Sequence, residues 1–284
     1  MSANMRLVAK NTVDDSRCVL TSSVAATITL ENLKKSARGK ITRIQAGASF
    51  EIKATFGGDS VRIAMAALLW TNFDIDATWR LQGYSDAAWT TQVVDSGTVA
   101  CIEATALGDL DFGVDPLGAN IFDPFYGQNF AKVYVAETVV GSWKLTISNT
   151  TNADGYIDAS RLIVGKYFEV TYNPVYGLKL GWKEATQVWE TDGGTPHSDA
   201  GTPYRVLTFD IQLIPEADRQ KWMDIVRYIG MRRDVFIDVM PEGSAAQRRD
   251  YAGNFIVQTM PDFTTQFMDS STNYDSTNMV LREV

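Results

Sequence analysis

The stretch between residues 64 and 165 constrains the fold most, because one short β-like segment follows another along it. The segments are rich in β-branched and aromatic residues and are bounded by Gly, Asn, Asp or Pro, which is typical of strands separated by turns. Helical periodicity is almost absent before residue 215. This spacing predicts a β-sandwich or barrel. The expected strands cover residues 60–70, 77–81, 98–105, 132–137, 142–148, 161–170 and 178–190.

Two of these segments also predict core side chains. In residues 79–82 (WRLQ) and 143–147 (WKLTI), apolar and polar residues alternate. Because successive side chains of a strand point to opposite faces, the apolar set should share one buried face. That set consists of Trp79, Leu81, Trp143, Leu145 and Ile147.

The segment 192–203 (DGGTPHSDAGTP) interrupts the strand pattern. It has two Pro, three Gly and almost no apolar residue, so it has nothing to pack into a core. We interpret it as a long hairpin loop or an interdomain linker. The sequence therefore predicts a sandwich domain over residues 1–191 and a smaller module over 204–284.

The C-terminal module is predicted to be α+β with one helix. Residues 204–213 alternate as a strand, and Pro215 with acidic residues after it is typical of a helix start. An apolar stripe follows at helical spacing, and Gly230 should end the helix. The stripe consists of Trp222, Ile225, Val226 and Ile229. Strands over 234–240, 251–257 and 278–283 complete the module.

Composition excludes several classes of partner. The formal net charge of −8 disfavours nucleic acid and anionic membranes, whose binding depends on Lys and Arg. The longest apolar run, residues 63–70, has eight residues, whereas ~20 are needed to span a bilayer. No targeting segment is visible. We therefore expect a protein that is made in the cytoplasm, binds no nucleic acid and inserts into no membrane.

The cysteines, Cys18 and Cys101, lie far apart and form no CxxC motif. This count excludes a disulfide framework and a zinc cluster. In a mostly β chain, two isolated thiols are expected to be small buried side chains.

No catalytic signature is present. The chain has one histidine, His197, which lies in segment 192–203, and no GxSxG, GxxxxGK[ST] or GxGxxG motif occurs. A general base can lie on a loop, but no strained nucleophile turn lies near this one, so we interpret His197 as a solvated loop histidine. We predict no catalytic residue, no cofactor and no metal site.

One acidic and aromatic stretch leaves a glycan-cleaving alternative open. Glycosidases need only two carboxylates about 5–10 Å apart, and residues 108–127 combine carboxylates with rings that would stack on a sugar. Our preferred interpretation is a polar loop whose aromatics pack against the sandwich or a neighbouring subunit. The residues concerned are Asp109, Asp111, Phe112, Asp115, Phe122, Asp123, Phe125 and Tyr126.

The sequence does not predict an EF-hand calcium loop. Residues 150–155 (TTNADG) match EF-hand positions three, five and six, but Thr150 and Arg161 stand where the loop requires carboxylates. We predict that Asn152 and Asp154 form an Asx-type turn instead.

Seven Trp and eleven Tyr raise the question of carbohydrate binding. Some of the tryptophans fall at inward positions of predicted elements and belong to the core. Others lie near strand ends or loops and are candidates for sugar stacking or subunit contact. These candidates are Trp70, Trp89, Trp182 and Trp189.

The motifs taken together resemble a known family. AALLWTNFDIDATWRLQGYSDAAWTTQVVDSG (66–97) and SNTTNADGYIDASRLIVG (148–165) are similar to a galactose-binding-like jelly-roll sandwich, in the form carried by structural proteins at the tail tip of tailed bacteriophages. The resemblance covers about residues 20–170, and the module from 204 onward resembles the α+β end of the same proteins. Residues 108–127 match no common element of the family.

The resemblance implies a mainly β fold, with a jelly-roll sandwich followed by an α+β module. It also implies a non-enzymatic virion protein of the distal tail or baseplate type. Such a protein forms a homo-oligomeric ring, a hexamer as the first expectation, between the tail tube and the hub or fibre proteins. The alternatives are a carbohydrate-binding module that contacts the host surface and, third, a surface-glycan hydrolase.

Overall fold

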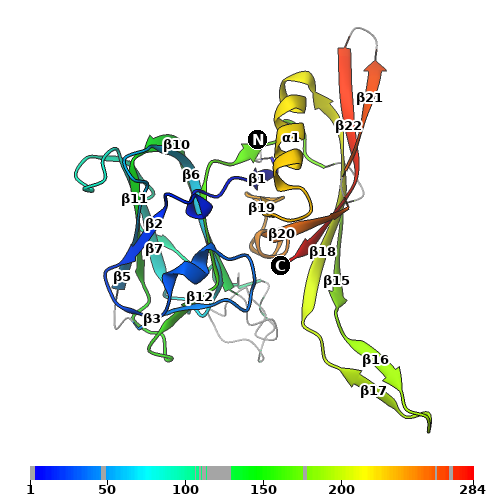
Figure 1. Ribbon diagram of the computed structural model, residues 1–284, viewed down its shortest axis with the longest axis horizontal. Helices are drawn as coiled ribbons and strands as arrows, with labels where there is room; N and C mark the ends of the chain where they lie inside the picture. The colour runs from blue at the N-terminus through cyan, green and yellow to red at the C-terminus, as the bar shows by residue number, and fades with distance from the viewer. Residues whose placement is uncertain are drawn as a thin grey trace. The chain divides into compact units, whose positions relative to one another are not determined.

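The computed structural model describes residues 4–45, 49–105, 107–108, 110, 113, 129–174, 178–259, 261–268 and 271–284. The fold is mainly β, a jelly-roll sandwich combined with an α+β unit, as the sequence predicted. The chain divides into two compact units (Figure 1). The sandwich unit comprises Lys10–Phe168 and Glu242–Ala252, and the arm unit comprises Met1–Ala9, Glu169–Pro241 and Gly253–Val284.

The sandwich unit is built from antiparallel sheets. Within the described residues, a six-stranded sheet has the order β2-β5-β11-β7-β8, and β9 also pairs with β7. Its strands are β2 (Val19–Ser22), β5 (Ser49–Thr55), β11 (Ser142–Ser148), β7 (Thr78–Tyr84), β8 (Gln92–Asp95) and β9 (Val99–Ala100). Smaller sheets are formed by β10 (Asn129–Val140), β6 (Val61–Thr71) and β13 (Arg161–Gly165), and by β12 (Ile157–Ala159), β4 (Thr42–Ile44) and β3 (Ala26–Ile28).

The sandwich core joins the inner face of the six-stranded sheet to side chains of β6, β10 and β13. β11 lies between β5 and β7, so Leu145 is paired with Ile52 on one side and with Leu81 on the other. The predicted core set is confirmed, because every member is buried. Cys18 and Cys101 are also buried, and burial raises the pKa of both thiols, that of Cys18 to about 11, so neither is activated.

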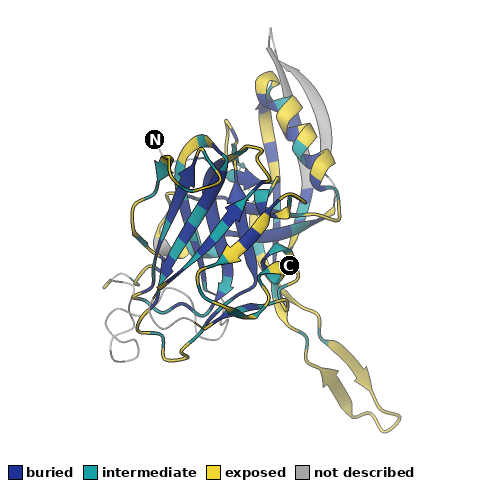
Figure 2. Ribbon diagram, turned by 60° about the vertical axis from the view of Figure 1, so that its left-hand side comes forward, coloured by how far each residue is buried: buried dark blue, intermediate teal, exposed yellow. Residues whose placement is uncertain are grey.

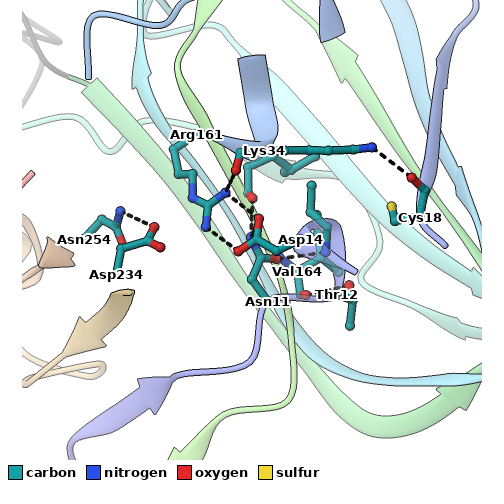
Figure 3. Close-up of polar contacts among 11 residues, drawn as sticks. Asn11, Thr12, Asp14, Cys18, Lys34, Arg161, Val164, Asp234 and Asn254 are labelled. Carbon is teal, nitrogen blue, oxygen red and sulfur yellow. Dashed lines mark hydrogen bonds and ion pairs between the residues drawn. The ribbon is translucent and has the colours of Figure 1, made fainter. Parts of the chain in front are cut away.

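A buried arginine fixes the two short 3₁₀ helices of this unit, η1 (Thr12–Asp14) and η2 (Leu30–Lys34). Arg161 on β13 donates to both carboxylate oxygens of Asp14 at 2.6 Å and to the Lys34 carbonyl oxygen at 2.5 Å (Figure 3). Asn11 supports the same corner, because its side chain caps η1 and donates to the Leu162 carbonyl oxygen. One charged side chain therefore holds three segments that are distant in sequence.

The arm unit contains an eight-stranded sheet within the described residues, with the order β14-β1-β19-β20-β22-β18-β15 and with β21 paired to β22. Its strands are β14 (Phe168–Glu169), β1 (Arg6–Val8), β19 (Asp234–Asp238), β20 (Ala252–Thr259), β22 (Ser271–Glu283), β18 (Pro203–Pro215), β15 (Lys179–Glu184) and β21 (Asp262–Met268). The buried pair Arg205 and Glu283 ties β18 to β22.

Helix α1 (Glu216–Ile229) packs on β18 and β22 of this sheet. Trp222, Val226 and Ile229 are buried, while Ile225 of the predicted stripe is only half-buried. Gly230 ends the helix with φ of 52°, in the left-handed region that favours glycine. The helix prediction is therefore confirmed in its position, in its end and in most of its buried face.

The unit boundary lies between Phe168 and Glu169, which differs from the predicted division at 192–203. The predicted sandwich domain also included residues 1–9, but β1 pairs with β19, more than 200 residues later. Segment 192–203 belongs to a hairpin formed by β16 (Gln187–Glu190) and β17 (Pro196–Asp199) and contains the turn after β16, all of β17 and the return to β18. Of the two predicted alternatives, the hairpin fits and the linker does not. The lack of apolar residues in this segment marks an unpacked hairpin, which looks the same in sequence as a linker.

Residues 242–252, which contain α2 (Ala245–Asp250), belong to the sandwich unit. No sequence pattern predicted this return. A capping box formed by Ser244 and Gln247 starts this helix. Arg248 forms an ion pair with Glu103 of the same unit. Among the described residues, no helix is long and apolar enough to cross a membrane.

Candidate functional site

The acidic stretch with the candidate residues Asp109, Asp111, Phe112, Asp115, Phe122, Asp123, Phe125 and Tyr126 lies outside the described residues. The predicted Asx turn is confirmed nearby in the chain, because the Asp154 backbone N–H donates to Asn152 Oδ1 at 2.9 Å. Among the residues that the structure describes, no group of three His, Cys, Asp or Glu side chains is placed to hold a metal ion.

The four candidate tryptophans occupy three different environments. Trp70 is half-buried near the end of β6. It is the extra residue of a β-bulge, because Leu69 pairs with Phe130 and Thr71 with Asn129, and its φ of 52° reflects that position. Trp70 is therefore a feature of the bulge.

Trp182 and Trp189 lie on an extended β-hairpin, which we call the arm (residues 178–204). The arm comprises β15, the hairpin β16–β17 and the start of β18, and none of its residues is buried (Figure 2). Trp182 is 48% exposed, Trp189 51% and Val188 69%. His197 stacks on Trp189 with ring centroids 6.2 Å apart. Large apolar side chains on a segment without a core mark an interaction surface.

Trp89 lies on a loop between β7 and β8 that is held by one carboxylate. Asp86 accepts hydrogen bonds from the Ala88 N–H at 2.8 Å, the Thr90 N–H at 3.0 Å and the Thr91 N–H at 2.7 Å. The Ser142 hydroxyl also donates to the Asp86 carbonyl oxygen at 2.6 Å, which joins the loop to β11. The backbone hydrogen bonds from Thr90 and Thr91 lower the pKa of Asp86 to about 2, against a small opposing effect of burial.

This preorganised loop sets Trp89 beside the outer face of the six-stranded sheet. The ring is half-buried and its φ is 56°, a conformation that bulky residues rarely adopt. The Lys53 ammonium lies 5.4 Å from the ring centroid. Non-glycine residues with positive φ persist where the surrounding structure holds them, and they concentrate at binding sites.

The outer face of the sheet carries two neighbouring groups of polar side chains, which we together call the polar face. Lys53 and Lys144 both contact Glu51, with N–O distances of 2.8 and 3.1 Å. Arg80 and Asp95 form a bidentate pair. The polar face consists of Glu51, Lys53, Arg80, Gln82, Gln92, Asp95 and Lys144, of which Gln82 donates to Gln92 at 2.6 Å.

Neighbouring cations lower the pKa of both carboxylates of the polar face. Burial raises the pKa of Glu51, but hydrogen bonds from Lys53 and Lys144 outweigh it and leave the pKa below its usual value. A hydrogen bond from Arg80 lowers the pKa of Asp95 to about 2, which burial opposes. Trp89 and the polar face thus combine an aromatic ring with oriented donors and acceptors, the arrangement that recognises polyhydroxylated ligands.

The sequence identified Trp89 but not the polar face. Glu51, Gln82 and Lys144 lie on three strands, and Lys144 is opposite both Lys53 and Gln82. Only strand order and register bring these residues together. A local signal existed for the loop alone, since an Asp followed by small and hydroxyl residues favours an Asx-type turn.

Comparisons with known proteins add similarity at the level of structure. No protein-family model matches the sequence, and no curated protein matches it. Among solved structures, this chain is similar to a GH29 fucosidase of Ruminococcus gnavus in complex with fucose, with 12% identity and a TM-score of 0.39 over 56% of this chain. The matched part is 27% of the fucosidase, so this chain spans about a quarter of that protein.

Two smaller domains are matched over nearly their whole length. One is CBM32-3 from a family 31 glycoside hydrolase of Clostridium perfringens, with 14% identity and a TM-score of 0.36 over 54% of this chain and 94% of that domain. The other is the family 32 carbohydrate-binding module of C. perfringens NanJ in complex with galactose, with 10% identity and a TM-score of 0.35 over 56% and 98%. At these identities and TM-scores the matches carry no argument about ligand or role.

Proposed function

We propose that the chain is a self-assembling structural subunit of a phage tail tip, an adaptor ring between the tail tube and hub or fibre proteins. The observation that carries the proposal is the arm, in which no residue is buried although Trp182, Val188 and Trp189 are large and apolar. The family resemblance supplies the phage context, the virion location and the expectation of six copies. The proposal assigns no catalytic role.

The physical argument concerns the stability of the arm. A two-stranded hairpin is marginally stable in water unless another layer covers it. Burying one large apolar side chain contributes roughly 1.5–3 kcal/mol, so covering Trp182, Val188 and Trp189 would provide a substantial free energy of association. A partner surface therefore gives this segment the layer that its own chain does not provide.

Each copy carries one arm, which allows a head-to-tail contact. If the arm of each copy contacts a different surface on the next copy, the contact repeats, and it forms a closed ring where the rotation between copies closes. A closed ring leaves no unused arm and no exposed acceptor surface. Repeated copies of the same contact would also give the symmetric platform that an adaptor between tail proteins requires.

Removal of the arm tip tests this function. Replacing residues 187–200 by an Asn-Gly turn shortens the hairpin beyond Thr186 and Gly201, which are already joined by a hydrogen bond of 3.0 Å. The intact chain should sediment as a closed oligomer at micromolar concentration, and the shortened chain as a monomer. The double variant Lys35→Ala and Lys40→Ala, on exposed positions of the sandwich unit, is the control. A monomeric intact chain that is absent from its parent particle would refute the proposal.

A second candidate function, carbohydrate binding by the sandwich unit, is favoured by Trp89 on its rigid loop beside the polar face. It is compatible with the first, since host-surface contact is one role of a tail-tip protein. A glycan array followed by calorimetry tests it. Trp89→Ala should weaken binding at least tenfold and Trp89→Phe should retain most of it, because stacking needs a ring. Glycan binding unchanged by Trp89→Ala would contradict this site.

A further inference from the structure

We infer that the outer part of the arm of one copy docks on the basic C-terminal end of α1 and the turn after it on the next copy, an inference that rests on the proposed self-assembly. Charge points to this pairing. From residue 184 to 204 the chain carries four carboxylates and no Lys or Arg. α1 as a whole carries as many carboxylates as cations, and Arg219 and Lys221 pair with Glu216 and Asp218. Its C-terminal end and the turn after it, residues 225 to 233, carry three Arg and no Asp or Glu, although the whole chain has a net charge of −8.

The basic residues share their surface with exposed apolar side chains. Met223 and Met231 are 40% and 57% exposed, and Tyr228 is exposed between them along the chain. The Arg233 guanidinium lies 4.2 Å from the Tyr228 ring centroid. We call this set, with Arg227 and Arg232, the α1 surface. The α1 surface and the arm both expose large apolar side chains next to charged ones. Their charges have opposite signs, so the two surfaces are electrostatically complementary.

Two arginines of the α1 surface are available to a partner. Arg227 and Arg232 are exposed, and neither forms an ion pair with any residue in the described part of the chain. On the arm, Glu190 and Asp192 are likewise exposed, and no ion pair holds them among the described residues. Two pairs of opposite charge thus remain unused on surfaces that each expose large apolar groups.

The two surfaces cannot meet within one copy. The arm continues from the N-terminal end of β18, whereas α1 begins at Glu216, directly after its C-terminal end (Figure 1). β18 has 13 residues, about 40 Å at the rise of an extended strand. α1 runs back for roughly 20 Å, and the tip of the arm extends away from β18 in the opposite direction. The contact is therefore between copies and head-to-tail.

Charge reversal on each side and on both sides tests the contact. Arg227→Glu with Arg232→Glu should weaken oligomerisation at least tenfold in concentration, measured by sedimentation velocity or mass photometry on the full chain. Glu190→Lys with Asp192→Lys should do the same. The chain with all four substitutions should recover most of the oligomer, because the pairs are restored with opposite signs. The double reversal Lys35→Glu and Lys40→Glu, on the sandwich unit, is the matched control.

The outcomes separate this inference from the proposed function. If the arm deletion abolishes the oligomer but reversal at Arg227 and Arg232 leaves it intact, the arm docks elsewhere and the α1 surface is refuted, while self-assembly stands. If both single-sided reversals weaken the oligomer and the combined variant does not recover, the two surfaces do not face each other, and the inference fails. If the intact chain never oligomerises, the proposed function fails first.

Discussion

β11 of the sandwich and the arm use the same secondary structure with opposite results. β11 lies between β5 and β7 in its sheet, and its side chains Trp143, Leu145 and Ile147 are completely buried in the core on one face of that sheet. In the arm, β16 pairs with β17 in a regular ladder, yet every residue of both strands is exposed. A ladder of backbone hydrogen bonds forms in both places, but only β11 has a second layer.

The difference shows what makes a strand stable in each region. Burial of apolar side chains, rather than the ladder, provides most of the free energy of a sheet. The sandwich therefore has a core of its own, whereas in our proposal the layer that covers the arm comes from a second copy. Substitutions in the sandwich should change the stability of the monomer, whereas the same substitutions in the arm should change association.

The largest expected effect is in β11. Trp143→Ala should lower the free energy of unfolding by about 5 kcal/mol, at the upper end for a fully buried ring, because Trp143 lies in the centre of the sheet. Trp189→Ala, the matched substitution in the arm, should change the stability of the monomer by less than about 0.5 kcal/mol. Urea unfolding measures both. Equal losses would contradict the difference between the two regions.

The second prediction tests whether stability differs between the two units or between buried and exposed segments of either unit. Trp222 is buried under α1 in the arm unit. Trp222→Ala should lower the free energy of unfolding of this unit by about 4 kcal/mol. This loss is smaller than that expected for Trp143→Ala, because a helix shifts into a cavity more easily than a central strand does. Gln220→Ala, at an exposed position of the same helix outside the α1 surface, is the control. A thermal midpoint unchanged by Trp222→Ala would show that the arm unit has no core of its own at α1.

Replacing a buried charged residue of the sandwich should lower the free energy of unfolding by less than the two tryptophan substitutions do. Arg161 is 1% exposed and paired with Asp14, so Arg161→Leu removes the ion pair and the contact with Lys34. Breaking a buried pair costs about 3–5 kcal/mol. We expect a loss of about 3 kcal/mol in the free energy of unfolding, at the lower end of this range. The Asp14 side chain is 39% exposed, so water solvates it once the pair is broken. Arg62→Leu, which breaks the exposed pair with Glu137, should cost less than about 1 kcal/mol. Similar losses for both would argue against a special role of burial.

The sequence predicted what local patterns encode. Alternation identified the inward face of β7 and β11, and helical spacing with Gly230 identified α1 and its end. It could not predict that β1 joins β19, that residues 242–252 return to the sandwich unit, or that Glu51 meets Lys144. Those pairings depend on contacts between segments far apart in sequence, whose partners no local pattern specifies. The sequence did predict Trp182 and Trp189 as contact candidates outside the core, but it could not predict that no residue of the whole hairpin around them is buried.

The smallest expected effect concerns the loop of Trp89, which differs from the arm in being held by its own chain. The folded pKa of Asp86 is about 2, below its ordinary value of 3.8. The hydrogen bonds of its carboxylate therefore stabilise the loop fully above about pH 4, and this contribution is lost as the pH falls towards 2. Trp89 fluorescence, taken as the difference between the intact chain and Trp89→Phe, should change over that interval before the core unfolds. Asp86→Asn should remove the pH dependence, because the amide does not titrate. If the transition persists in Asp86→Asn, another carboxylate controls the loop, and Trp89 is then presented by the sheet rather than by Asp86.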